Sequence, residues 1–394
     1  MSSVKENSEQ GNDDRWMRRA LELARRGFGY VEPNPMVGCV LVKEGRSIGE
    51  GWHRKYGEAH AEVMAIDSAS ESTSGATCYV TLEPCCHHGK TPPCTGALTD
   101  AGIAEVVVAC LDPDPRNSGQ GMSELRSAGI DVRTGVQAQS GEALVAPFRK
   151  LLTYNSPWMI AKWAMTLDGK LATASGDSKW ISGTASRQRV HEMRGAMDAI
   201  LIGIGTALAD DPLLTARPAG QRRATRIVLD RNARLPLESQ LVQTAHECPV
   251  LVVVTDLADE QKIDDLKRAD CEVLIAAEQT KEGIWRQLLI EMGSRCWTNV
   301  MIEGGSEVLG TCFDLAIVDE VHVFIANKIA GGAHSGPVDG VGHGLMADAD
   351  QLESCQVETI DEDLYISGRI VRPDACLRES VDQAEQSRPS DASS

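Results

Sequence analysis

The chain has 394 residues, with 39 Lys and Arg against 57 Asp and Glu, 12 Cys and only 4% aromatic residues. At roughly 100–200 residues per domain, this length indicates two or three domains. The net charge of −18 argues against a protein that coats DNA or RNA, whose affinity depends on Lys and Arg that neutralise phosphates. Small anionic ligands remain compatible with it, because a pocket needs only local basic groups.

The distribution of cysteines and apolar residues indicates the cellular compartment. Twelve Cys without regular spacing lack the density of a small disulfide scaffold. The N-terminus is polar, without the apolar core of a signal peptide. No stretch reaches the roughly 18–20 consecutive apolar residues of a membrane span. The sequence therefore predicts a cytoplasmic protein with no membrane partner.

The first half of the chain alternates helices with strands. Polar residues 1–12 and 378–394 cannot bury enough apolar surface to fold, and we predict disorder for both. Between them, the apolar spacing predicts a helix over 14–29, a hairpin over 33–52, helices beginning near His60, Cys94 and Met122, and strands over 76–82, 105–112 and 130–135. This alternation is typical of an α/β sheet covered on both faces.

A break around residues 148–156 separates the two halves. Pro147 and the run Asn155-Ser156-Pro157 interrupt the pattern, which predicts domains over 13–150 and 157–373. The second half opens with an extended segment over 159–172, and short apolar runs follow over 199–210, 225–230, 248–256, 271–277, 298–314 and 320–326. Polar or helical connections separate these runs, so we expect a second α/β sheet.

The first set of chemical residues begins at His60-Ala61-Glu62 and continues with Pro84-Cys85 and Cys94. One imidazole and two thiolates with an open fourth position are typical of catalytic zinc, which lowers the pKa of a bound water towards ~7. Glu62 is suited to carry the proton from that water to a leaving amine. The H-x-E…P-C-x-x-C signature of zinc nucleobase deaminases is similar, although eight residues separate the two cysteines here.

A structural zinc site is the alternative to this interpretation. Such a site needs a fourth His or Cys, and Cys86, His87 or His88 could supply one.

The segments PNPMVGCV, GEGWHRKYGEAHAEV and EPCCHHGKTPPC resemble the deaminase half of the bifunctional riboflavin-biosynthesis deaminase/reductase family. The resemblance implies that Asn34, His53, His87 and Lys90 contact the pyrimidine or its ribose phosphate. Asp112-Pro113-Asp114-Pro115 departs from the usual D-P-N-P of that family. The departure puts a hydrogen-bond donor in doubt at Asp114, and its negative charge is unhelpful near a phosphate unless it faces away.

The second set of chemical residues lies in LIGIGTALADDP and MIEGGSEVLG. Each is a strand, a glycine-rich turn and a helix, which aims backbone N–H groups at a phosphate. Neither matches G-x-G-x-x-G, so a standard Rossmann fingerprint is not supported. From Lys162 onward, however, KWAMTLDGKLATASGDSKWISG, ILIGIGTALADDPLLTAR, RIVLDRNAR and MIEGGSEVLG resemble, in order, the reductase half of the same family.

The resemblance implies two groups of reductase residues. Those at an NADPH cofactor are Ala164, Trp180, Thr206, Asp210, Arg231, Gly305, Ser306, Glu307, Val308, Leu309, Gly310 and Thr311. Those at the substrate are Ser178, Arg194, Leu214, Arg217 and Glu303, of which the two arginines suit a ribose phosphate. Asp210 is favoured over Asp211 as the catalytic carboxylate. Arg222, Arg223 and Arg226 are rivals of Arg231 for the cofactor 2′-phosphate.

The resemblance implies an N-terminal cytidine-deaminase-like three-layer α/β domain and a C-terminal dihydrofolate-reductase-like α/β domain. It implies one Zn²⁺ per chain for hydrolytic deamination of diaminohydroxyphosphoribosylaminopyrimidine. NADPH-dependent reduction of the ribosyl side chain to ribityl would follow, in a homo-oligomer formed through the reductase domain. Three alternatives stay open: a nucleic-acid-editing deaminase, which the acidic charge disfavours, a non-catalytic zinc-stabilised interaction protein, and a working deaminase fused to an inactive reductase.

Overall fold

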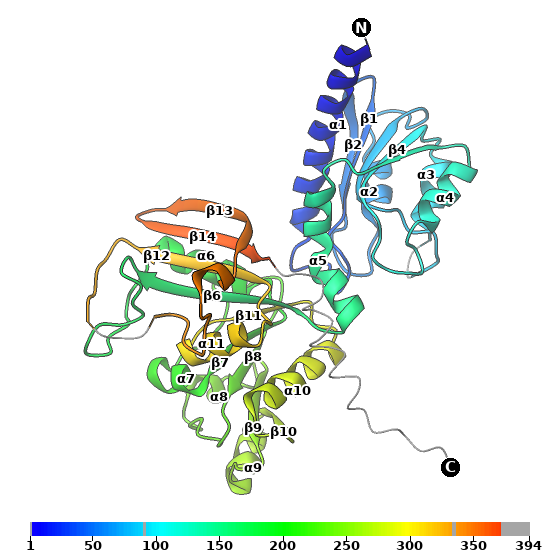
Figure 1. The fold of residues 1–394 in the computed structure, drawn as a ribbon. Helices are drawn as coiled ribbons and strands as arrows, with labels where there is room; N and C mark the ends of the chain where they lie inside the picture. Colours follow the sequence, from blue (N-terminus) through cyan, green and yellow to red (C-terminus); the bar gives the residue numbers. More distant parts are fainter. Residues whose placement is uncertain (1, 90–91, 333–335, 372–394) are drawn as a thin grey trace, which may run out of the picture. The chain divides into compact units, whose positions relative to one another are not determined.

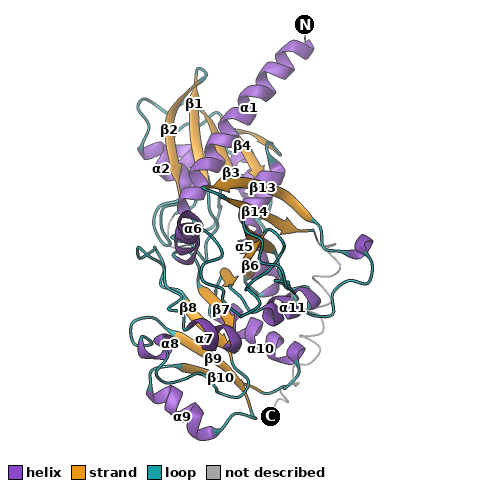
Figure 2. Cartoon of the chain, turned by 90° about the vertical axis from the view of Figure 1, so that its left-hand side faces the viewer, coloured by secondary structure: helices purple, strands orange, loops and turns teal. Residues whose placement is uncertain are grey.

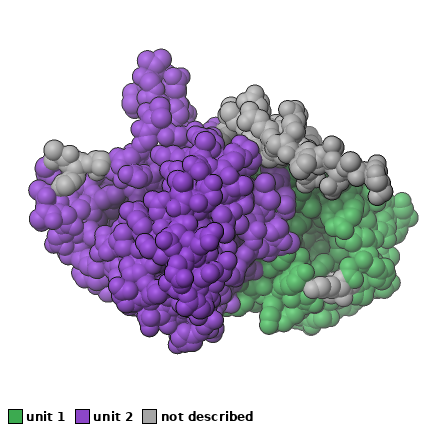
Figure 3. All heavy atoms as spheres, turned by 90° about the horizontal axis from the view of Figure 1, so that it is seen from below, with its two compact units in different colours: residues 1–153 green, residues 154–394 purple. Residues whose placement is uncertain are grey.

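The computed structural model describes residues 2–89, 92–332 and 336–371, with side chains from residue 11 onward (Figure 1). The predicted disordered tail 378–394 lies outside these residues. The chain divides into two compact units, residues 1–153 and 154–394, which Figure 3 shows in two colours. None of the described helices is both long and apolar enough to cross a membrane.

The first unit is built on a five-stranded sheet in the order β2-β1-β3-β4-β5. Its strands are β1 (Gly38–Lys43), β2 (Arg46–Trp52), β3 (Thr77–Leu82), β4 (Glu105–Cys110) and β5 (Asp131–Thr134). β1 pairs antiparallel with β2, as the predicted hairpin, and with β3, whereas β3, β4 and β5 run parallel. The remaining elements are α1 (Ser2–Ala24), η1 (Arg25–Gly27), α2 (Ala61–Asp67), α3 (Cys94–Asp100), α4 (Gln120–Ser127) and α5 (Ala138–Tyr154).

Helices cover both faces of this sheet. Strand residues such as Val40 pack with Met17 of α1 and Leu144 of α5 on one face. Their neighbours along the strands, such as Leu41, pack with Ala65 of α2 and with α3 and α4 on the other. This alternation follows from the two-residue period of a strand, and the predicted three-layer fold is confirmed.

Helix α1 extends beyond its predicted bounds, and helix α5 was not predicted. α1 begins at Ser2, although we predicted disorder over 1–12. This stretch contains no proline, and once the later turns are anchored, adding residues to a helix costs much less than starting one. α5 runs through Pro147 to Tyr154, so the predicted interruption at Pro147 is wrong. Val145, two residues before the proline, packs against Leu82 of β3 and Cys110 of β4.

Helix α2 lies directly on strand β2, and glycines make this approach possible. A Cβ atom at Gly51 would lie 2.3 Å from the carbonyl oxygen of Ala61 and 2.4 Å from the backbone nitrogen of Ala65. At Gly49 it would lie 2.3 Å from the carbonyl oxygen of Ala65. Because His60 and Glu62 stand at the start of α2, the two glycines set the position of these side chains.

We predict that Gly51→Ala destabilises the first unit by about 1–3 kcal/mol, because the helix backbone must move away from the strand. The change should appear as an earlier urea midpoint. Gly96→Ala in α3 is the matched control, because a Cβ atom there would have no heavy atom within 4 Å. An unchanged midpoint for Gly51→Ala would mean that the helix does not depend on this contact.

The second unit contains a nine-stranded sheet in the order β10-β9-β8-β7-β11-β6-β12-β14-β13. Figure 2 labels β7, β8, β9 and β10 of this sheet. Its strands are β6 (Trp158–Thr166), β7 (Ala199–Gly203), β8 (Thr225–Leu229), β9 (Val250–Thr255), β10 (Glu272–Ala276), β11 (Asn299–Ile302), β12 (Glu320–Ala326), β13 (Leu352–Ile360) and β14 (Asp363–Ile370). The strands from β10 to β12 are parallel, as the predicted α/β pattern requires.

The antiparallel hairpin β13–β14 at one edge of the sheet was not predicted. Its sequence signals are weak, because β13 is largely exposed and shows no clear apolar alternation. β14 begins with a clearer pattern, since Asp363, Tyr365 and Ser367 are buried at alternating positions, but only Tyr365 among them is apolar.

Helices complete the second unit. They are α6 (Thr184–Arg194), α7 (Ile204–Asp210), α8 (Gln240–Gln243), α9 (Glu260–Arg268), α10 (Lys281–Ser294) and α11 (Ser306–Asp314), with the short η2 (Met346–Asp348). Adjacent strands β7 and β11 lead into α7 and α11, and the chain then continues to opposite sides, to β8 and to β12. At such a switch point a crevice forms outside the carboxyl ends of the strands.

Candidate active sites

Three side chains from separate segments meet in the first unit. His60 is the residue before α2, Cys85 follows β3, and Cys94 begins α3. The Nδ1 atom of His60 lies 3.3 Å from the Sγ atom of Cys94 and 3.5 Å from that of Cys85. All three ligand atoms lie within 4.8 Å of one another. One imidazole and two sulfur donors are a ligand set that zinc prefers, so the predicted residues fit the metal.

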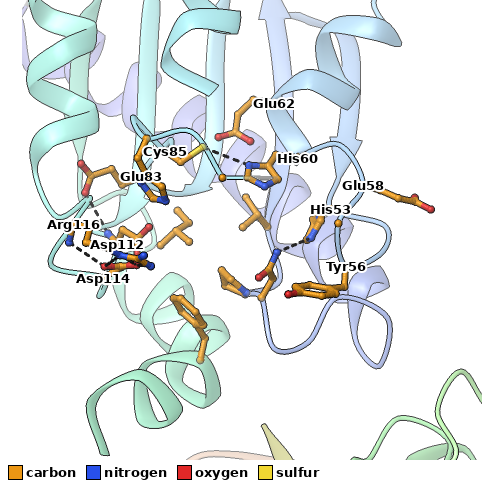
Figure 4. A pocket seen from close by; sticks show the side chains of 18 residues that line it. His53, Tyr56, Glu58, His60, Glu62, Glu83, Cys85, Asp112, Asp114 and Arg116 are labelled. Carbon is orange, nitrogen blue, oxygen red and sulfur yellow. Dashed lines mark hydrogen bonds and ion pairs between the residues drawn. The ribbon is translucent and has the colours of Figure 1, made fainter. Parts of the chain in front are cut away.

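Cys85 is the acidic thiol of this cluster. Hydrogen bonding with Cys94, joined by His60, outweighs burial and lowers the pKa of Cys85 to about 4. The thiolate is the form that binds a metal. Glu62 is only 3% exposed, and burial raises its pKa. Figure 4 shows Glu62 beside Cys85 and His60 at one end of the cavity.

A cavity of about 260 Å³ opens in front of this cluster and is lined by Asn34, His53 and His87, among others. The Nδ2 atom of Asn34 lies 3.3 Å from Nε2 of His53, whose Nδ1 lies 3.2 Å from the carbonyl oxygen of Ala59. The structure therefore brings these three predicted substrate residues together. Lys90 lies outside the described residues.

Cys86 does not join the metal ligands. Among the described residues, the metal-ligating group contains only His60, Cys85 and Cys94. The Cys86 thiol instead donates a hydrogen bond to Oδ1 of Asn117, at 3.0 Å. Cys86 therefore does not supply the fourth ligand of a structural site.

Asn117 is a residue that the sequence did not single out. It is fully buried, and its Oδ1 also accepts the Cys86 N–H at 2.9 Å. Its Nδ2 donates to Asp112 at 3.0 Å. The amide thus ties the backbone beside Cys85 to the loop after β4. An Asn two residues beyond D-P-D-P was a weak signal, because its partner lies 31 positions away.

The second unit holds a larger cavity, of about 740 Å³, at the carboxyl ends of β7 and β11. The predicted residues that line it are Ala164, Ser178, Trp180, Arg194, Thr206, Asp210, Leu214, Arg217, Glu303, Gly305 and Leu309. Ser178 Oγ lies 3.5 Å from an Asp210 oxygen. Asp211, which also lines the cavity, accepts the backbone N–H of Gln240 at 2.8 Å.

A buried ion cluster forms part of this cavity wall. Nε and Nη2 of Arg194 lie 2.5 and 2.8 Å from the two Glu303 carboxylate oxygens. Nζ of Lys162 lies 3.5 Å from the same carboxylate. Two cations therefore surround one anion, which leaves a net positive charge that suits a phosphorylated ligand. Lys162 was not predicted as a site residue; its signal was a lone Lys inside an apolar strand.

Other predicted cofactor residues lie outside the cavity wall. Arg231 donates to the carbonyl oxygen of Gln279 at 2.8 Å. Ser306, Glu307, Val308, Gly310 and Thr311 do not line the cavity. Thr311 is turned to the Glu307 carbonyl at 2.8 Å. The rival Arg226 is fully buried among backbone carbonyls, so it is not available to a cofactor.

Comparisons with known proteins agree with this geometry. Residues 157–366 match the model of the RibD C-terminal domain, and residues 10–110 match the cytidine and deoxycytidylate deaminase zinc-binding region. The chain is 41% identical to the riboflavin biosynthesis protein RibD of Actinobacillus pleuropneumoniae over 91% of this chain and 95% of that protein. The chain belongs to the RibD family.

Further RibD proteins match over nearly their whole length. The Escherichia coli protein is 36% identical over 93% of this chain and 98% of its own. The structure of Acinetobacter baumannii RibD superposes with a TM-score of 0.77, at 34% identity, over 92% of this chain and 100% of its own. A Thermotoga maritima deaminase/reductase superposes with a TM-score of 0.78, at 36% identity, over the same shares.

Membership in the RibD family confirms several predictions. The chain is a bifunctional enzyme of riboflavin biosynthesis, with a cytidine-deaminase-like domain and a RibD reductase domain. The predicted cofactors, zinc and NADPH, are those of these domains. The roles of the individual residues remain predictions.

We predict that Asn117→Ala weakens zinc binding about 10-fold, because a residue behind the ligands no longer holds the Cys85 segment. The partly buried Cys86 N–H also loses its acceptor, which costs about 1–3 kcal/mol of unfolding free energy. Competition with a chelator measures the first effect and urea unfolding the second. Gln120→Ala, which removes an exposed amide, is the control. Equal zinc affinity in the two variants would contradict the assigned role.

We also predict a pH dependence at Glu303. Burial favours the neutral acid, but Arg194 and Lys162 outweigh it and lower the pKa of Glu303 to about 2, from an ordinary 4.5. A folded-state pKa below the ordinary value stabilises the fold above about pH 4.5, and this stabilisation disappears as the pH falls towards 2.

The variant Glu303→Gln should therefore lose on the order of 3 kcal/mol near neutral pH, and less as the pH falls from 4.5 to 2. Urea unfolding at several pH values measures the difference from the unmodified protein. Glu307→Gln, an exposed carboxylate of α11, should show no such trend. A difference that stays constant below pH 4.5 would refute the charge pairing.

Proposed function

We propose that residues 13–150 carry the hydrolytic deamination of diaminohydroxyphosphoribosylaminopyrimidine, and that residues 157–373 carry the reduction of its ribosyl side chain. The observation that supports the first step best is the meeting of His60, Cys85 and Cys94 beside buried Glu62. Zinc, when bound, acts as a Lewis acid towards water. Glu62 accepts a proton from that water and delivers it to the leaving amine, so water and amine become carbonyl and ammonia.

Neutral and basic side chains on the cavity wall orient the pyrimidine in this proposal. Asn34 and His53 form one hydrogen-bonded pair, which fixes the orientation of the Asn34 amide and of the His53 imidazole. Burial lowers the pKa of His53, so its ring is neutral near pH 7 and offers one donor and one acceptor. His87, and by the family resemblance Lys90, complete the contacts.

For the reductase, we propose that the positive wall of the larger cavity binds the phosphorylated intermediate. Arg194, Arg217, Ser178, Leu214 and Glu303 are the proposed substrate residues, and all of them line the cavity. NADPH, when bound, supplies the hydride. The proposed cofactor residues are Ala164, Trp180, Thr206, Asp210, Arg231 and the segment 305–311. In this proposal Asp210 exchanges a proton with the substrate, and its position beside Ser178 on the same wall supports that role.

We further propose a cytoplasmic homo-oligomer, joined through the reductase domain, that does not bind nucleic acid. The charge of −18 supports the last point. Light scattering tests the homo-oligomer, and a low-salt binding assay with single-stranded DNA tests the absence of nucleic-acid binding.

Substitution of Glu62 tests the two-step assignment. We expect Glu62→Gln to retain zinc but to abolish ammonia release, because the amide cannot accept the proton. NADPH oxidation from the diamino substrate should stop as well. It should return when the deaminated intermediate is supplied, because the reductase site is intact.

Glu58→Gln is the control, since Glu58 lines the same cavity at an exposed position. Normal ammonia release by Glu62→Gln would exclude Glu62 as the proton carrier. Failure of the deaminated intermediate to restore NADPH oxidation would indicate an inactive reductase.

A further inference from the structure

The loop after β4 places a carboxylate, Asp114, and a guanidinium, Arg116, at the cavity of the deaminase domain. Asp112 accepts the backbone N–H of Asp114 at 2.8 Å. The carbonyl oxygen of Asp114 accepts the N–H groups of Asn117 and Ser118, each at 2.9 Å. These short-range bonds fold the loop on itself and keep Asp114 only 6% exposed.

Asp114 binds one edge of the Arg116 guanidinium. Nε of Arg116 lies 3.0 Å from both carboxylate oxygens, and Nη2 lies 2.5 Å from Oδ2. The arginine lowers the pKa of Asp114, so the acid stays ionised near neutral pH. The Arg116 side chain itself is 74% exposed. Within the described part of the chain, no acceptor contacts Nη1, so the edge formed by Nη1 and Nη2 is available to a ligand.

The other charges of the cavity make this edge significant. Five carboxylates line the cavity: Glu58, Glu62, Glu83, Asp112 and Asp114. Among the described lining residues, Arg116 is the one Lys or Arg. A phosphate ester carries about −1.5 to −2 charges at pH 7, and these carboxylates would repel it. In the D-P-D-P-R sequence, the cation two residues after Asp114 offsets the charge that the departure from D-P-N-P introduces.

Asp114 and Arg116 lie where the phosphate end of the substrate is expected. Figure 4 shows Asp114 and Arg116 across the cavity from His53 and Tyr56, away from Glu62. The reacting amine of the pyrimidine must lie near the zinc ligands. The phosphate is at the far end of the ribose, so it points away from them.

We propose that Arg116 binds the phosphate of the deaminase substrate through its Nη1–Nη2 edge, and that Asp114 is the positioning residue that orients the guanidinium. A planar guanidinium can serve two oxyanions at once, because its donors form separate forks. The inference rests on the deaminase reaction proposed above. In this proposal Asp114, which stands where the D-P-N-P pattern has Asn, contributes to the phosphate site instead of weakening it.

Kinetics with two substrates test the proposal in the full-length zinc-loaded protein. Ammonia release is followed with the phosphoribosylated diaminopyrimidine and with the same compound lacking the phosphate. We expect Arg116→Gln to raise the KM for the phosphorylated substrate about 10–100-fold, the loss expected for one charge-assisted contact. The KM for the dephosphorylated compound and the kcat for both should stay within about twofold of the unmodified protein.

Further variants separate phosphate binding from a structural role. Arg116→Lys keeps the charge but loses the fork, so its KM should fall between those of the unmodified protein and Arg116→Gln. Asp114→Asn should raise the KM only while Arg116 is present, so the double variant should match Arg116→Gln alone. Arg46→Gln, which breaks the ion pair between Arg46 of β2 and Glu71 in the loop after α2, is the matched control. Inorganic phosphate should inhibit the unmodified protein more strongly than Arg116→Gln.

Two results would overturn the inference: an equal KM change for both compounds, or no change for either. Zinc content and the urea midpoint of each variant identify a folding defect, in which case Arg116→Lys decides. If the unmodified protein releases no ammonia from the phosphorylated compound, the proposed deaminase function itself has failed.

Discussion

The constraint that shapes both cavities is the cost of placing carboxylates out of water. A buried charge costs several kcal/mol unless hydrogen bonds or an opposite charge compensate for it. Backbone N–H groups of Asp112, Gly119 and Met122 compensate Glu83. Two cations compensate Glu303. In this chain of net charge −18, the cations Arg194 and Lys162 line the larger cavity as well as compensating Glu303.

This compensation explains why both sites lie where strands end. At the carboxyl ends of parallel strands the chain leaves the sheet, and its loops and helix starts offer backbone N–H groups without intrahelical partners. In the first unit these groups hold Glu83, which lies one position beyond β3 and two before Cys85. In the second unit the ends of β7 and β11 border the larger cavity. Both cavities thus lie at strand ends, but backbone N–H groups compensate Glu83, whereas side-chain cations compensate Glu303.

The sequence predicted features that depend on neighbouring residues, and it did not predict contacts between residues that are far apart in the chain. His60, Glu62, Cys85 and Cys94 stand in compact motifs whose residue types restrict the chemistry, and the alternating apolar runs predicted the strands of both sheets up to β12. Asn117 was not predicted, because its role comes from a contact 31 positions away. Lys162 meets Glu303 across 141 positions, and β13 offers little apolar pattern. Such contacts depend on the order of the strands, which periodicity does not specify.

Asp114 illustrates how a local change can be interpreted in two ways. Considered alone, a carboxylate in place of an amide removes a donor and repels a phosphate. With Arg116 two residues later, the same carboxylate becomes an anchor, because it is buried and the arginine is not. An exposed arginine on its own loses side-chain entropy when it binds a ligand. One whose Nε edge is already held by a buried acid has less to lose, so the acid at position 114 strengthens the anion site that it was expected to weaken.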